Sequence, residues 1–239
     1  MGQKVNPNGF RTGVTLENGV KLDWKSHWSA TKREYPDLLV EDQKIRRHIK
    51  KNYRDARISS VRIERTREKV IVSISAAKVG VIIGPKGAKV EELTNQLQNL
   101  TNRLIEVKTV EVANPQVDAQ LVAEDIADQL EKRQSFRRTL KRSMETTMGG
   151  GARGVRIQLS GRLGGAEMAR CESGMLGSIP LSTLRAKVNY GFSEAATAQG
   201  NIGIKVWVNN GDYLTEEKSD GSHAQTGKVS KKPARQGKR

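Results

Sequence analysis

A turn containing two glycines at residues 84–87 constrains the fold of this chain more than any other stretch. It consists of Gly84, Pro85, Lys86 and Gly87. An apolar run at 79–83 precedes the turn, and apolar residues at 90, 93 and 97, which share one helical face, follow it. Glycine tolerates positive φ and close backbone approach, and the N–H groups that open a helix attract phosphate. The pattern therefore predicts a clamp for a sugar-phosphate backbone, with the charge of Lys86 at its tip and the apolar run as a wall for bases.

The segments around the turn narrow the fold further. Their periodicity predicts a helix at 41–54, strands near 61–64 and 70–75, an apolar helical segment at 79–83, a helix ending near 100 and a strand at 104–112. The order is α-β-β-α-α-β, with Gly-x-x-Gly between the two adjacent helices. A KH domain holds the RNA backbone with such a loop. Residues 38–113 therefore resemble a type II KH RNA-binding domain.

The net charge indicates the class of partner. The chain carries 42 Lys and Arg against 26 Asp and Glu, a formal net charge of +16, which is typical of a polyanion binder. A membrane is the alternative, but no run of ~18 apolar residues occurs. Because Cys171 is the only cysteine and no secretion signal is visible, we expect a cytoplasmic protein without disulfides or a cysteine-based zinc site.

Residues 1–37 form a predicted N-terminal arm. Gly, Asn and Pro recur here without a sustained period, which predicts an irregular segment with one short helix. Phe10, Trp24 and Trp28 are large apolar side chains that are costly to leave in water. Part of the arm should therefore pack on something, and a partner RNA, a partner protein and the chain's own core are all open.

The second half of the chain predicts another domain. Pro115 disfavours helix at the residue before it, which makes 114–116 a boundary. Two helical tracts follow, the first opened by Asp118, with a bend near 134–135. Alternating strands are expected around 155–159, 184–190 and 202–208. We therefore predict a two-layer α+β domain at 118–210 and a disordered basic tail at 211–239.

The second of these helical tracts has a basic face. At 100° per residue, four cations fan over one half of the helix, and Phe136 and Leu140 lie opposite. The four are Arg137, Arg138, Lys141 and Arg142. An ordinary solvated face is the alternative. However, the cluster at 137–142 contains no acid, and a polyanion would relieve the repulsion between like charges.

No pattern in the sequence indicates catalysis. His27, His48 and His223 have no second ligand at metal spacing. Residues 149–154 match G-x-G-x-x-G formally, but they lead into a strand rather than a helix, and no P-loop occurs. We expect no enzyme activity, no cofactor, no metal and no small-molecule substrate.

Several separate segments resemble the family of bacterial small-subunit ribosomal protein S-three. They are residues 1–11, 81–87, 136–142, 160–167, 184–186 and 203–207. Their occurrence in the family's order over nearly the whole chain is more specific than any single motif. The resemblance implies an N-terminal type II KH domain and a C-terminal α+β domain.

The resemblance also implies a location and partners. Family members sit in the head of the small ribosomal subunit, bind ribosomal RNA and line the mRNA entry channel, beside the tenth and fourteenth small-subunit proteins. Arg137, Arg138 and Lys141 would then face incoming mRNA and help to open its structure, with Arg142 beside them. Pro85 stands where the family commonly has a second lysine, which predicts a weaker phosphate contact. Further candidates for contact with ribosomal RNA are Lys4, Asn6, Arg11 and Arg162.

Two other functions stay open at this point. A free KH-domain regulator usually carries tandem KH repeats or an effector domain, and the other Gly-x-x-Gly match, at 161–164, lacks the helical pattern. An RNA-modifying enzyme or GTPase with a KH appendage would need the nucleotide or metal motifs that the sequence lacks.

Overall fold

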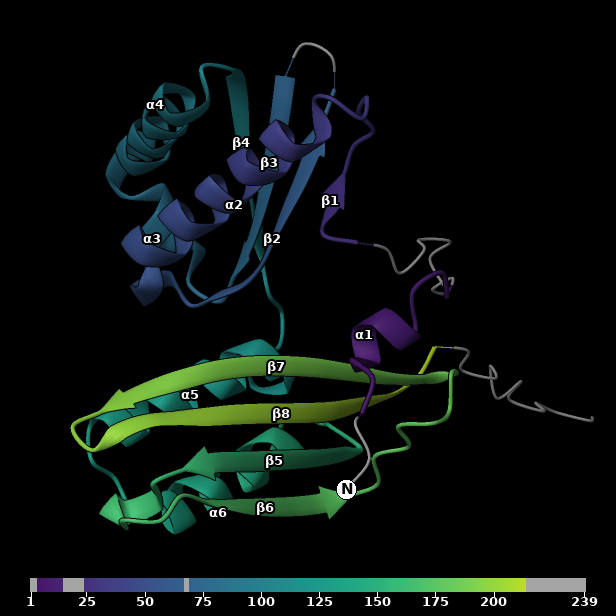
Figure 1. The fold of residues 1–239 in the computed structure, drawn as a ribbon, viewed down its shortest axis with the longest axis vertical. Coiled ribbons are helices and arrows are strands. Elements are labelled where there is room, and N and C mark those ends of the chain that lie inside the picture. Colours follow the sequence, from purple (N-terminus) through teal and green to yellow (C-terminus); the bar gives the residue numbers. More distant parts are fainter. Residues whose placement is uncertain (1–3, 15–23, 67–68, 214–239) are drawn as a thin grey trace, which may run out of the picture.

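The computed structural model describes residues 4–14, 24–66 and 69–213, which contain two four-stranded sheets. The strand order is β1-β2-β3-β4 in the first sheet and β6-β5-β8-β7 in the second. Helices cover one face of each sheet (Figure 1). Apart from its first three residues, the predicted tail at 211–239 lies outside the described residues.

The structure confirms the predicted α-β-β-α-α-β order of the KH domain, whose strands form most of the first sheet. Its elements are α2 (Tyr35–Asn52), η1 (Arg54–Ala56), β2 (Ile58–Arg65), β3 (Lys69–Ala76), α3 (Val79–Ile83), η2 (Pro85–Gly87), α4 (Ala88–Thr101) and β4 (Leu104–Glu111). β3 pairs antiparallel with β2 and parallel with β4. Helix α2 begins before the predicted residue 41 because Pro36, in its first turn, is compatible with a helix start.

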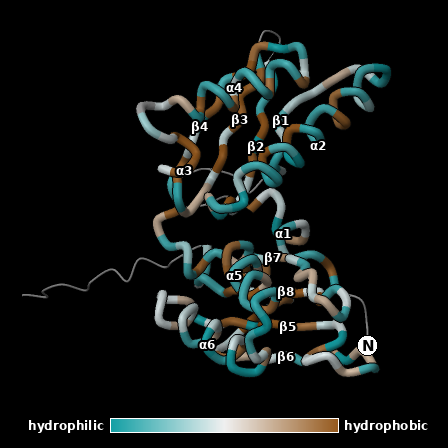
Figure 2. Tube along the Cα trace, turned by 90° about the vertical axis from the view of Figure 1, so that its left-hand side faces the viewer, coloured by the Kyte–Doolittle hydropathy of each residue, from teal (hydrophilic) through white to brown (hydrophobic). Residues whose placement is uncertain are grey.

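The core of this unit follows from the periodicities. Ile45 and Ile49 of α2 and Leu97 of α4 are fully buried against alternate strand residues such as Ile63 and Val72. Figure 2 shows hydrophobic residues along β2 and hydrophilic turns on the outside of α2. One buried apolar face on each element is what a two-layer unit requires.

The N-terminal arm is more regular than predicted. Besides α1 (Pro7–Phe10), it contains β1 (Ser26–His27), which pairs parallel with β2 at the edge of the first sheet. A two-residue strand is too short to show a period, so the sequence could not reveal it. Trp28 donates its indole N–H to Asp42 at 2.8 Å. For Trp28, the packing partner is therefore the chain itself.

The second unit contains one strand that the sequence analysis missed. Its elements are η3 (Pro115–Val117), α5 (Ala119–Glu131), α6 (Phe136–Gly149), β5 (Gly154–Gly161), η4 (Leu163–Gly165), β6 (Arg170–Gly177), β7 (Ala186–Thr197) and β8 (Gly200–Asp212). β6 is an edge strand with mostly exposed side chains, so it lacks the apolar alternation that marks a half-buried strand. The predicted strand at 184–190 begins only at Ala186, and Leu184 is half exposed.

Helices α5 and α6 lie on the same face of this second sheet (Figures 1 and 2). Asp118 caps α5, since its Oδ1 accepts from the N–H groups of Gln120 and Leu121. Ile126 packs with Ile157 and Val206 in the shared core. A Cβ at Gly191 would lie 2.2 Å from the carbonyl oxygen of Ala119, so β7 and the start of α5 approach closely only because residue 191 is glycine.

Charged contacts join the two units. Arg54 forms ion pairs with Asp128 at 2.9 Å and Glu131 at 3.1 Å, and Arg57 pairs with Asp125 at 2.7 Å. All of these side chains are partly exposed, so each pair contributes little alone. Together the contacts link residues 54–57 of the KH unit to α5.

Candidate nucleic-acid interface

The basic face of α6 is an exposed surface. Its opposite face is buried through Thr139, Leu140, Ser143, Met144 and Thr147. Arg137, Arg138, Lys141 and Arg142 are all exposed. In the described part of the chain, none of these four forms an ion pair or hydrogen bond with another residue. The structure therefore confirms a helix with one buried face and an exposed face that carries four cations without ion-pair partners.

A fifth cation, missed by the sequence analysis, joins this surface. The guanidinium carbons of Arg137 and Arg170 each lie 5.6 Å from the centre of the Phe136 ring, within the range of cation–π attraction. Arg170 begins β6, and it also forms an ion pair with Glu172 at 3.3 Å. Because β6 was not predicted, nothing in the local sequence linked Arg170 to α6.

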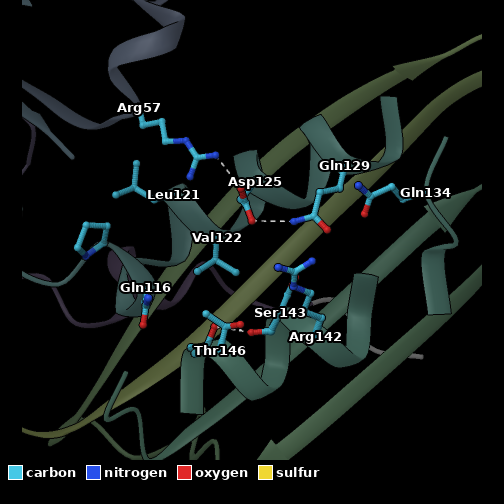
Figure 3. Close-up of a pocket in the computed structure, with 12 residues that line it drawn as sticks. Arg57, Gln116, Leu121, Val122, Asp125, Gln129, Gln134, Arg142, Ser143 and Thr146 are labelled. Carbon is cyan, nitrogen blue, oxygen red and sulfur yellow. Dashed lines mark hydrogen bonds and ion pairs between the residues drawn. The ribbon is translucent and has the colours of Figure 1, made fainter. Parts of the chain in front are cut away.

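Arg142 lies apart from the other three α6 cations. It lines a cavity of about 370 Å³ between α5, α6 and the linker at Pro115 and Gln116. Figure 3 shows its guanidinium below Gln129, whose amide N–H group donates to Asp125 at 2.8 Å. Arg137, Arg138 and Lys141 do not line this cavity. The predicted set of four thus divides into an outward group of three and one side chain at the α5–α6 cavity.

The glycine turn has the backbone that the sequence predicted. Gly84 ends α3 with φ of 69°, and Gly87 caps α4 with φ of 83°. Side chains rarely adopt these angles. A Cβ at Gly84 would also lie 2.6 Å from Cγ of Lys89. Pro85 is exposed, and the side chain of Lys86 lies outside the described residues. The turn therefore presents the backbone at the start of α4 without a side chain at either glycine.

The apolar wall predicted beside this turn is wrong for Ile82 and stays a prediction for Val79, Val81 and Ile83. Ile82 is fully buried, and Val79 and Val81 pack against the core of the KH unit. Ile83 is the one apolar side chain of the run that is exposed, at 39%. The run is a short helix, so one side chain, Ile82, faces the core while Ile83 faces outward.

Arg11 is not placed to contact RNA, and that prediction is wrong. Its side chain is buried, with 1% exposure, and its guanidinium donates only to backbone carbonyls. The acceptors are the oxygens of Pro7, Pro180, Leu181, Thr183 and Ala186, at 2.6–3.3 Å. Burial lowers the pKa of the guanidinium. Arg11 therefore ties the arm to the loop that precedes β7.

The other three candidates for contact with ribosomal RNA are exposed. Lys4 and Asn6 lie in the arm, where the Asn6 side chain accepts from the N–H of Asn8 and caps α1. Arg162 donates to the carbonyls of Ala166 at 2.9 Å and Gln199 at 3.1 Å, so it also shapes its own turn. RNA contact remains a proposal for all three.

The described residues show neither a metal site nor a membrane span. In the ranges 4–14, 24–66 and 69–213, no cluster of three His, Cys, Asp or Glu side chains is arranged to hold a metal ion. In the same ranges, no helix is both long and apolar enough to cross a membrane.

Comparison with known proteins gives consistent results for both units. Residues 44–117 match the family model described as KH domain, and residues 126–208 match that of ribosomal protein S3, C-terminal domain. The chain is similar to small ribosomal subunit protein uS3 of Rhodopirellula baltica, with 55% identity over the whole of both chains. It is also similar to the proteins of that name from Desulforamulus reducens (50% identity; 91% of this chain and 96% of the relative) and Finegoldia magna (52%; 91% and 88%).

Proposed function

This chain belongs to the ribosomal protein S3 family, and from that premise we propose that its helix α6 guides incoming mRNA into the small ribosomal subunit. The chain is a non-enzymatic constituent of that subunit with a KH RNA-binding domain. The whole-length match to ribosomal relatives supports this role over that of a free KH-domain regulator. The tenth and fourteenth small-subunit proteins are its proposed neighbours.

The observation that carries the proposal is the outward group of Arg137, Arg138 and Lys141. These cations lack ion-pair partners within the described residues, so they are available to phosphates. Leu140 and Met144 hold the helix in the core, so the cations keep their position when an RNA strand pulls on them. A fixed cationic surface of this kind binds the strand without chemistry. The energy for opening a hairpin would come from movement of the mRNA during translation.

Replacing Arg137, Arg138 and Lys141 together with glutamine should slow translation of a message with a stable hairpin relative to an unstructured message. The salt dependence of single-stranded RNA binding should also fall, by about two in the slope of log K against log salt, since each lost phosphate contact removes about 0.7. Both effects can be measured with subunits reconstituted around the variant and with the isolated chain.

A matched control removes the same charge elsewhere, with Lys32, Arg33 and Lys44 changed to glutamine. These residues are exposed and lie outside α6. The entry role is wrong if structured and unstructured messages are slowed equally by the α6 variant, or if the control has the same selective effect.

Replacing Pro85 and Lys86 with aspartate should weaken binding of single-stranded RNA and reduce its salt slope, because negative charge would then face the phosphates at the start of α4. Both positions precede a helix whose first N–H groups lack a side-chain cap. A control with Lys44 and Asn95 changed to aspartate has the same net charge change at exposed positions. An unchanged slope in the loop variant would mean that this turn does not contact RNA.

A further inference from the structure

Four cations converge on a small cavity that lies away from both the glycine turn and α6. The cavity has a volume of about 190 Å³ and lies between α2, β2 and the segment that leads into β1. Its basic lining residues are Lys25, Arg46, Arg47 and Lys50. Its other lining groups are uncharged, including Gln43, Ser59, Ser60 and Gln120, and no carboxylate lines it. The cavity therefore concentrates positive charge.

Helix periodicity explains why α2 can supply three of these cations. Positions 43, 46, 47 and 50 are spaced by three, one and three residues and share one face of α2. Ile45 and Ile49, on another face, are buried in the KH core. The buried face fixes the rotation of the helix, so the basic face must lie over β2.

Arg46 organises the cavity from within. Its guanidinium donates to the carbonyl oxygens of Val61 and Lys25 and, at 2.8 Å, to the hydroxyl of Ser26. These bonds hold the start of β1 against β2 and bring Lys25 to the cavity. Arg46 is thus a positioning residue, whereas Arg47 and Lys50 are exposed cations at the rim.

The like charges disfavour one another. Burial, with repulsion from Lys50 and Arg46, lowers the pKa of the Lys25 amine, and burial also lowers the pKa of Arg46. The nearby acids lie outside the lining: Asp118 partly offsets the lowering of the Lys25 pKa, and Asp42 partly offsets that of Arg46. A third acid, Glu124, has its own pKa raised by burial, which Lys50 opposes. Asp118 is already engaged by the hydroxyl of Ser59 at 2.5 Å. A bound anion would remove the repulsion that the fold leaves in place.

We propose that this cavity, lined by Lys25, Arg46, Arg47 and Lys50, binds a phosphate of an RNA backbone. The Ser60 hydroxyl and the Gln43 amide add neutral polar groups around the cations, whereas the Ser59 hydroxyl is engaged by Asp118. The cavity shares no lining residue with the glycine turn or with α6, so it would hold a different part of the RNA from either. This inference rests on the chain's being a ribosomal constituent but not on the mRNA entry role of α6.

The test uses the full chain with Arg47 and Lys50 changed to glutamine, and a matched control with Lys44 and Lys51 changed to glutamine. Both control positions are exposed on α2 and line no part of the cavity. Binding to purified small-subunit ribosomal RNA and to an unstructured 20-nucleotide RNA is measured over a range of salt concentrations. We expect the cavity variant to reduce the salt slope by about 1.4 for two lost contacts, and the control to leave it nearly unchanged.

The two RNA probes separate the sources of the phosphate. A reduced slope for ribosomal RNA alone supports a structural contact, and a reduced slope for the 20-mer as well supports a phosphate that any strand can supply. A second measurement follows the backbone amide resonances of residues 59–61 during titration with inorganic phosphate, where shifts are expected in the unmodified chain and not in the cavity variant. Equal slope changes in cavity variant and control, or no amide shifts, would overturn the proposal.

The same variants distinguish this proposal from the entry role. Subunits with the α6 variant could translate structured messages normally while the cavity variant still shows a reduced salt slope of RNA binding. The entry role would then be wrong, and the phosphate site would be supported. Alternatively, the cavity variant could bind RNA like the unmodified chain while subunits with the α6 variant translate hairpin messages slowly. The phosphate site would then be wrong, and the entry role would be supported.

Discussion

Replacing Asp42 with alanine is expected to destabilise the KH unit by about 3–5 kcal/mol, the cost of leaving a buried charge without its partner. Asp42 and Arg65 are both buried, with side-chain exposures of 4% and 5%, and the Arg65 Nε–H donates to the carboxylate at 2.9 Å. Without Asp42, the Arg65 guanidinium would keep one carboxylate, the half-buried Glu41 at 2.8 Å, with weaker contacts to the Leu38 carbonyl and the Trp28 ring. A buried cation that has lost its closest carboxylate has little water to compensate it.

The loss should spread to the N-terminal arm. The Asp42 carboxylate also accepts from the hydroxyl of Ser26 at 3.0 Å and from the indole of Trp28. Alanine would therefore remove two of the contacts between α2 and the arm, leaving those of Arg46 in place, while weakening the core. Because the chain has two units and need not unfold in one step, hydrogen exchange resolved by segment is the appropriate measurement. Faster exchange is expected in α2, β1 and β2, and little change in α5 and α6.

The control for this prediction is Asp55→Ala, which removes an exposed acid from the same unit. That change should alter stability by less than about 0.5 kcal/mol, as is usual for surface positions. Equal effects of Asp42→Ala and Asp55→Ala would show that the buried pair does not hold the arm in solution.

Replacing Arg11 with methionine should destabilise the attachment of the arm to the second unit by about 3 kcal/mol or more. Methionine keeps the length of the side chain but donates nothing, so the carbonyls around the guanidinium lose their donor. An unsatisfied buried carbonyl costs about 1–3 kcal/mol, and water entering the gap would satisfy some of the five. The loop at 178–185 should become protease-sensitive, and its amides should exchange faster.

Lys4→Met is the matched control for Arg11→Met, since it removes a cation from the same arm at an exposed position. It should leave the loop protected. RNA binding supplies a second readout. If Arg11→Met lowered the affinity for ribosomal RNA while leaving loop protection and stability unchanged, the buried role of Arg11 would be wrong and the original RNA prediction would return.

The local sequence pattern was sufficient to predict burial where one side of an element is buried and the other is exposed. Ile45, Ile49 and Leu97 are buried as their helical spacing predicted, and Leu140 opposes the exposed cations of α6. Gly84 and Gly87 have the positive φ expected of them. For the helices, the spacing of apolar residues within one element is enough to predict its buried face, because side chains 3.6 residues apart on average share a face.

Pattern failed where the deciding neighbour is far away in the chain. β6 is an edge strand without a buried face of its own, and the apolar run at 79–83 was predicted to face outward although Ile82 closes the core. The cavity lined by Lys25, Arg46, Arg47 and Lys50 has one part that local pattern predicts and one part that it does not. Its helical face is visible as a stripe, but Lys25 joins it only through the pairing of β1 with β2.

The sequence alone determined the α-β-β-α-α-β order, the glycine turn, the two helices of the second unit and a charge suited to RNA. Only the tertiary structure decided what each cation does. Arg11 and Arg137 are both arginines beside a phenylalanine in the sequence, yet one is buried among carbonyls of residues 180–186 and the other faces outward. The physical reason is that hydrogen bonding and desolvation depend on groups brought together across 169 or more positions of the chain. The local periodicity of the sequence cannot predict contacts between residues so far apart in the chain.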